Sequence, residues 1–128
     1  MNGATDGDYV YAPGVINNSG KLTINGGTFN GVSNCYALTN KTGAEMVING
    51  GTFTASRGVI AAEGGTVTIN GGTFTVTGDS SIPAHVVYAS NGNVTVNGGT
   101  FVNNGTGTGK IFCDKGDGGT GTITDNRD

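Results

Sequence analysis

Few residues of this chain could carry acid–base chemistry, and the sequence does not bring them together. Charged residues make up only 12% of the 128 positions, and the formal net charge is -3 at pH 7. Hydrolysis of a sugar chain needs two carboxylates on one face, one of them acting as the acid. No two acidic residues are expected at matching positions of neighbouring repeat units, so we expect no enzyme. The acidic residues are Asp6, Asp8, Glu45, Glu63, Asp79, Asp114, Asp117, Asp125 and Asp128.

The residues that could bind a metal or act as a nucleophile are equally isolated. His85 is the only histidine, whereas a zinc site needs several His or Cys ligands. Asp114 and Asp117 are close enough in sequence to hold a cation, although a solvated turn is the preferred interpretation. Cys35 and Cys113 fall three repeat units apart, about 14 Å at the spacing of paired strands, so we expect free thiols. The sequence therefore predicts no metal and no cofactor.

An eight-residue motif recurs along the chain and defines the elements that position these side chains. It reads LTINGGTF at 22–29, MVINGGTF at 46–53, VTINGGTF at 67–74 and VTVNGGTF at 94–101, and a degraded copy, GTITD, occupies 121–125. Apolar residues stand two apart before each Asn, with Thr between them in three copies, which is the period of a strand. A helix would not tolerate the 26 glycines of this chain. The pattern predicts an all-β fold.

A unit this short cannot bury its own inner face, whereas stacked units bury a continuous core. We expect a parallel β-solenoid of about five coils with three short strands each. The repeats span 14–125, with a partial coil or cap at 1–13 and a tail at 126–128. Matching positions then form columns about 4.8 Å apart. The inward columns are expected to be Ile24, Ile48, Ile69, Val96 and Ile123, and Phe29, Phe53, Phe74 and Phe101.

The polar corner of the motif also has an expected structural role. The Asn side chains can hydrogen-bond amide to amide between neighbouring coils, and the two glycines that follow supply a positive φ or a close approach of chains. The ladder is expected to consist of Asn25, Asn49, Asn70 and Asn97.

These blocks resemble the pectin-lyase-like superfamily of right-handed parallel β-helices. More narrowly, they are similar to the INGGTF-type repeats of large bacterial cell-surface, adhesin-like and phage-associated proteins. The resemblance covers roughly 14–125. It implies a right-handed parallel β-helix and an extracellular or cell-surface location, as a fragment or a mature form without a signal peptide. It implies no single activity, because the superfamily includes lyases, hydrolases, tailspikes, adhesins and inert spacers.

Threonine columns form the first candidate binding surface. Thr28, Thr52, Thr73 and Thr100 are expected in one outward column, and Asn30, Thr54, Thr75 and Val102 in the next. A further column of Thr23, Thr68, Thr95 and Thr122 is interrupted by Val47. Paired Thr-x-Thr positions also occur on ice-binding β-solenoids, so ice binding is an alternative function. Threonine suits any exposed strand, however, and the unequal coil lengths favour that simpler explanation.

Loops of variable length form the second candidate surface. Insertions in a solenoid collect at one edge, which is often the binding face. The loops offer Arg57, Asp79, His85 and Lys110 as polar groups, with Tyr36 and Tyr88 on the strands that follow them. A Tyr ring packed against a sugar would suit a glycan ligand. The sequence leaves open whether the two Tyr side chains point outward.

Composition and the chain ends narrow the partners. A pI near 4.8 leaves no basic patch for nucleic acid, and no apolar run approaches the length of a membrane span. No amphipathic helix is expected to cap either end, although Asp8–Tyr11 could begin a partial coil. The chain is therefore interpreted as a segment of a longer solenoid, or as a unit that associates end to end into a filament.

The expected function is that of a non-catalytic extracellular, cell-surface or phage-associated module. It would act as a structural stalk or as an adhesive surface for a glycan or another cell-surface ligand. Ice binding through the Thr columns and a remnant of a polysaccharide lyase or hydrolase are the alternatives. Thermal hysteresis would identify the first alternative, and release of sugar products would identify the second.

Overall fold

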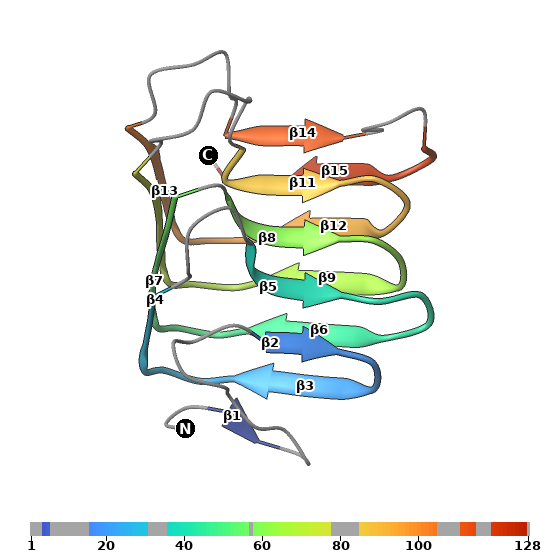
Figure 1. Ribbon diagram of the computed structural model, residues 1–128, viewed down its shortest axis with the longest axis horizontal. Coiled ribbons are helices and arrows are strands. Elements are labelled where there is room, and N and C mark those ends of the chain that lie inside the picture. Colours follow the sequence, from blue (N-terminus) through green and yellow to red (C-terminus); the bar gives the residue numbers. More distant parts are fainter. Residues whose placement is uncertain are drawn as a thin grey trace.

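The computed structural model describes residues 4–5, 16–30, 36–56, 58–77, 85–104, 111–114 and 119–127, and these residues form a β-solenoid (Figure 1). Their regular structure consists of strands alone. In chain order the strands are β1 (Ala4–Thr5), β2 (Ile16–Asn18), β3 (Lys21–Ile24), β4 (Thr28–Asn30), β5 (Tyr36–Asn40), β6 (Glu45–Ile48), β7 (Thr52–Ala55), β8 (Gly58–Ala62), β9 (Thr66–Ile69), β10 (Thr73–Val76), β11 (Val87–Ala89), β12 (Asn93–Val96), β13 (Thr100–Asn103), β14 (Phe112–Asp114) and β15 (Thr122–Asp125).

Strands at the same place in successive coils pair in parallel and build three sheets (Figure 1). The six-stranded sheet has the order β1-β3-β6-β9-β12-β15, the four-stranded sheet β13-β10-β7-β4, and the five-stranded sheet β14-β11-β8-β5-β2. The coil is right-handed, the sense that strand twist favours for parallel crossovers. The predicted fold class is confirmed. Four coils supply all three strands, whereas the described part of the fifth supplies only β14 and β15.

The first strand breaks the parallel pattern. β1 runs antiparallel to β3, with Ala4 opposite Ile24, so it covers the edge of the six-stranded sheet in the first coil. The partial coil that Asp8–Tyr11 could begin lies outside the described residues.

Apolar columns fill the interior as the repeat predicts. Ile24, Ile48, Ile69 and Val96 are all 0% exposed, because parallel pairing stacks them one above another. The four Phe rings of the repeat stack with centroids 4.8, 4.9 and 4.8 Å apart and interplanar angles of 7°, 3° and 8°. Such pairs contribute about 0.5–1.5 kcal/mol each beyond the burial of their area. The predicted Phe column is therefore confirmed as a main part of the core.

The Asn-Gly-Gly corner between the six-stranded and four-stranded sheets recurs in each full coil. The predicted Asn ladder is confirmed, since Nδ2 of each Asn donates to Oδ1 of the Asn one coil earlier, at 2.9 Å (Asn49 to Asn25), 2.9 Å (Asn70 to Asn49) and 3.0 Å (Asn97 to Asn70). The two glycines have different roles. A Cβ at Gly98 would lie 2.5 Å from the carbonyl oxygen of Asn70, whereas Gly99 has a φ of +108°.

The last coil follows a register that the sequence pattern misassigned. Val94 pairs with Ile123 and Val96 with Asp125, so the expected alignment of Ile123 with Val96 is wrong by two residues. Asn126 consequently joins the Asn ladder, and its Nδ2 donates to Oδ1 of Asn97 at 3.0 Å. Asn126, the first residue of the tail expected at 126–128, thus still belongs to the last coil. The fifth copy lacks the Gly-Gly-Thr-Phe that marks the other corners, and an alternating Thr-Ile-Thr fits either register.

Candidate functional site

Most of the variation in coil length lies at one edge of the solenoid. The connections from the four-stranded to the five-stranded sheet cover 31–35, 56–57, 77–86 and 104–111, whereas each Asn-Gly-Gly corner takes three residues. Because the strands that these connections join are neighbours within each sheet, the connections share one edge. The strand ends that flank the variable connections therefore lie along one edge of the solenoid. The first residues of β5, β8 and β11 lie at this edge.

Three aromatic side chains meet at this edge and form what we call the aromatic cluster: Tyr36, His85 and Tyr88. The His85 ring is nearly parallel to the Tyr88 ring, at 8° and 5.8 Å between centroids. The Tyr36 ring also contacts the Tyr88 ring. Their centroids lie 6.0 Å apart, and their planes are tilted by 32°. All three side chains are partly exposed. The structure thus brings together three of the residues predicted for the second candidate surface, Tyr36, His85 and Tyr88.

Small residues in the third coil allow this cluster to form across two coil steps. Tyr36 pairs with Gly58, and a Cβ at Gly58 would lie 2.2 Å from Cε2 of the Tyr36 ring. Tyr88 pairs with Ala61, which presents only a methyl group. The two Tyr rings can therefore approach each other over the third coil, where a larger side chain would separate them. The sequence shows this only after the register of β5, β8 and β11 is known.

The other predicted loop residues contribute less to a described site. Arg57, Asp79 and Lys110 lie outside the described residues, as do Asp117 and Cys35. Cys113 is a free, partly exposed thiol in β14 and pairs with Tyr88.

The Thr columns lie on the outward face of the four-stranded sheet. Thr28, Thr52, Thr73 and Thr100 are exposed and in register, and the next column holds Asn30, Thr54, Thr75 and Val102, as predicted. Unequal coil lengths do not disturb these columns, because the loops absorb the difference. On the six-stranded sheet, Thr124 rather than Thr122 continues the column of Thr23, Thr68 and Thr95, so that part of the prediction was wrong.

Two ion pairs join charged side chains that both lie among the described residues. Lys41 Nζ lies 3.1 Å from Glu63 Oε1 on the surface, and Arg127 Nε lies 2.9 Å from Asp125 Oδ1. Hydrogen bonds from the Arg127 side chain and then from its backbone hold the pKa of Asp125 below its ordinary value. No group of three or more His, Cys, Asp or Glu side chains gathers within the described part of the chain in a way that could hold a metal ion.

Sequence reasoning missed a second, internal Asn ladder. Asn18 Nδ2 donates to Asn40 Oδ1 at 2.9 Å, and Asn40 Nδ2 donates to the carbonyl oxygens of Ala44 and Gly64 at 3.1 and 3.0 Å. Both side chains are buried, and they satisfy backbone carbonyls at the turn between the five-stranded and six-stranded sheets. The signal was the shared Asn that ends β2 and β5. Ala62 replaces it in the third coil, so the ladder is short.

Comparisons with known proteins supply no relative from which to transfer a function. The chain matches no family model, no curated protein and no solved structure. Among the described residues, no helix has the length and apolar character needed to cross a membrane.

Proposed function

We propose that this chain is a non-catalytic β-solenoid module of an extracellular, cell-surface or phage-associated protein, and that its aromatic cluster binds a glycan. The observation that supports this most directly is the meeting of Tyr36, His85 and Tyr88 at the variable-loop edge. Tyr rings provide large, rigid contact surfaces at low cost in side-chain entropy, and each hydroxyl adds a polar group. A sugar ring offers the matching chemistry, with apolar C–H groups on its faces and hydroxyls at its rim.

The solenoid itself suits the stalk part of this proposal. Each coil packs on its neighbours through columns of buried Ile, Val and Phe, so the cluster is carried on regular strands. A site on rigid elements is preorganised, which lowers the entropic cost of binding. Glu63 and Asp125 each form an ion pair with a basic residue, Lys41 and Arg127.

A glycan array with the folded chain tests this function. Tyr88→Ala is expected to weaken binding of any glycan hit at least tenfold, which corresponds to about 1.4 kcal/mol. Tyr88→Phe separates the ring from the hydroxyl and should retain most of the affinity. Thr73→Ala, on the four-stranded sheet, is the control for unrelated surface changes. A wild-type chain that binds no glycan, or a Tyr88→Ala variant that binds like wild type, would refute the proposal.

Ice binding is a second candidate function, and the register of the Thr columns favours it. Thr52, Thr54, Thr73 and Thr75 form a two-by-two array on adjacent strands, at the strand spacing of about 4.8 Å. Asn30 and Val102 interrupt the outer parts of the second column. Thermal hysteresis of the wild-type chain tests this candidate, with Thr73→Lys expected to abolish any activity. The absence of hysteresis in the wild type would exclude it.

A further inference from the structure

The inward column of the six-stranded sheet changes from apolar to charged in the last coil. Ile24, Ile48, Ile69 and Val96 are completely buried, and the next position in register is Asp125. The Asp125 side chain is 36% exposed. A coil or another molecule seated on β15 would have to cover this carboxylate, which is costly unless the charge stays paired.

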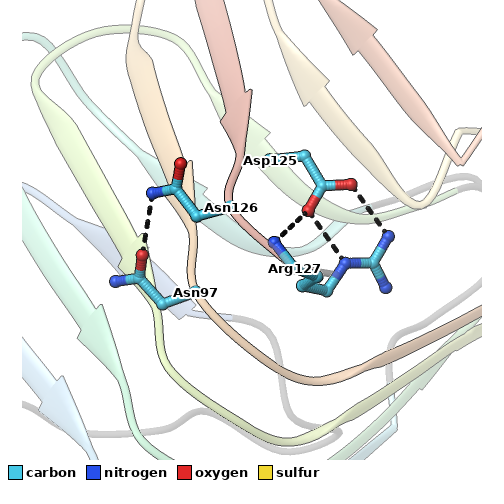
Figure 2. A network of polar contacts seen from close by, with 4 residues as sticks. All are labelled: Asn97, Asp125, Asn126 and Arg127. Atoms are coloured by element: carbon cyan, nitrogen blue, oxygen red, sulfur yellow. Dashed lines mark hydrogen bonds and ion pairs between the residues drawn. The ribbon is translucent and has the colours of Figure 1, made fainter.

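Arg127 places a second charge over the end of the Phe column. Its Nε and Nη2 donate to the two carboxylate oxygens of Asp125 at 2.9 and 3.1 Å, and its backbone N donates to Oδ1 at 3.1 Å (Figure 2). The guanidinium carbon lies 4.8 Å from the centroid of Phe101 and 5.2 Å from that of Phe112. A planar cation over aromatic faces is attracted by the ring electrons. We call Asp125 and Arg127 the C-terminal lid.

The rest of this end is suited to contact with another chain. β15 stands last in the strand order of the six-stranded sheet within the described part of the chain, so it presents a strand edge at this end. Phe112 packs edge-on against Phe101, with centroids 5.2 Å apart. Exposed strand edges and apolar rings promote association, and charges at such an edge are a common means of preventing it.

We propose that the C-terminal lid prevents this end of the solenoid from pairing with a second copy of the chain. Opening the lid would join two copies through their last coils, related by a two-fold axis. This arrangement is favoured over head-to-tail stacking because β1 already occupies the edge of the six-stranded sheet in the first coil. A two-fold interface closes on itself and gives dimers, whereas head-to-tail contacts would give filaments.

Sedimentation velocity over a wide range of protein concentration tests the proposal. Wild type should stay monomeric, whereas Arg127→Ala and Asp125→Val should dimerise with an association constant at least tenfold above that of wild type. Lys41→Ala is the matched control for Arg127→Ala, because it removes a surface ion pair for which the described contacts include no aromatic ring. Glu45→Val is the matched control for Asp125→Val, because it adds a valine on the outward face of β6. Both controls should remain monomeric.

Several results would overturn the proposal. The proposal is wrong if wild type associates as strongly as the lid variants. It is also wrong if the lid variants stay monomeric with a native circular dichroism spectrum, or if the control variants dimerise as strongly as the lid variants. If Arg127→Ala does not fold, Arg127→Lys gives the decisive test, because lysine keeps the charge but cannot lay a planar group over Phe101. Arg127→Lys association above wild type supports the lid, and wild-type behaviour contradicts it.

The orientation of the dimer is tested separately with spin labels. Cys113 lies in β14 of the last coil and is partly exposed, so it can carry a label once Cys35 is replaced by Ser. In an associating lid variant, two last coils in contact predict a short distance between the labels. A distance comparable to the length of the whole solenoid would show head-to-tail contact and overturn the two-fold arrangement.

Discussion

Alanine substitution of the first glycine in each corner should have an effect that depends on the coil. Gly26 lies in the first coil, where an added Cβ would meet nothing within 4 Å. At Gly50, Gly71 and Gly98 the added Cβ would meet the carbonyl oxygen of the Asn in the preceding coil, at 3.0, 2.8 and 2.5 Å. The same substitution can therefore be compared in four equivalent corners. In three of them a backbone carbonyl oxygen obstructs the new methyl group, and in the first coil nothing does.

The expected magnitudes follow from two opposing effects. Replacing Gly by Ala where the backbone permits it stabilises a protein by about 0.4–1 kcal/mol, because the unfolded chain loses freedom. Overpacking against a neighbour costs about 1–3 kcal/mol. Gly26→Ala should therefore be neutral or stabilising, while Gly98→Ala should lose up to about 2.6 kcal/mol net. Displacement of this corner would also weaken the bond between Asn97 and Asn70, now 3.0 Å long.

Thermal and urea unfolding followed by circular dichroism measure this series. The order of stability should be Gly26→Ala, then Gly50→Ala, then Gly71→Ala, with Gly98→Ala lowest. One kcal/mol corresponds to a shift in Tm of roughly 4 °C for a chain of this size. Stacked repeats can lose two-state behaviour, so equal urea m-values are required before free energies are compared. Equal losses at Gly26 and Gly98 would refute the explanation by close approach.

Three further predictions concern the core, the ladder and the lid. Phe74→Ala should lower the free energy of unfolding in urea by about 3–5 kcal/mol, since this fully buried ring stacks on both neighbours. Asn70→Ala breaks two ladder bonds and Asn25→Ala breaks one, so the first loss of stability should be about twice the second, at ~0.5–1.5 kcal/mol per bond. Because the pKa of Asp125 is lowered on folding, the lid's contribution is present above the ordinary Asp pKa and is lost as pH falls through the lower folded value. Sedimentation should therefore show monomers at pH 5 and association only in more acidic solution, and association already at pH 5 would contradict this.

The features that could be predicted from the sequence are those that occur in every full copy of the repeat. The Phe column and the Asn ladder each place one residue per coil at a fixed distance from the Gly-Gly pair, so parallel stacking leaves them one arrangement. The prediction of register failed in the last coil, where the copy of the repeat lacks the Gly-Gly pair. In the last coil the only remaining guide was the alternation of Thr122, Ile123 and Thr124, and a shift of two residues preserves an alternating pattern.

The aromatic cluster and the lid were harder to predict for a different physical reason. Tyr36 and Tyr88 belong to coils that are not adjacent, and their contact depends on Gly58 lying between them. Arg127 reaches Phe101 and Phe112 only because Asp125 and Asn126 take the register that the pattern missed. Both sites depend on which residues face each other across coils, and a single repeat does not contain that information.

The two kinds of connection explain why binding chemistry would gather at one edge. The Asn-Gly-Gly corner requires a close approach in the later full coils, as at Gly98, and a positive φ, as at Gly99. Its length therefore stays constant while the opposite connections vary from 56–57 to 77–86 without moving a single Thr of β7 and β10 out of register. The connections can thus differ in length while the register of the core strands stays the same. A module built this way can alter the surroundings of Tyr36, His85 and Tyr88 while the strands that carry them stay fixed, which is the property an adhesive surface requires.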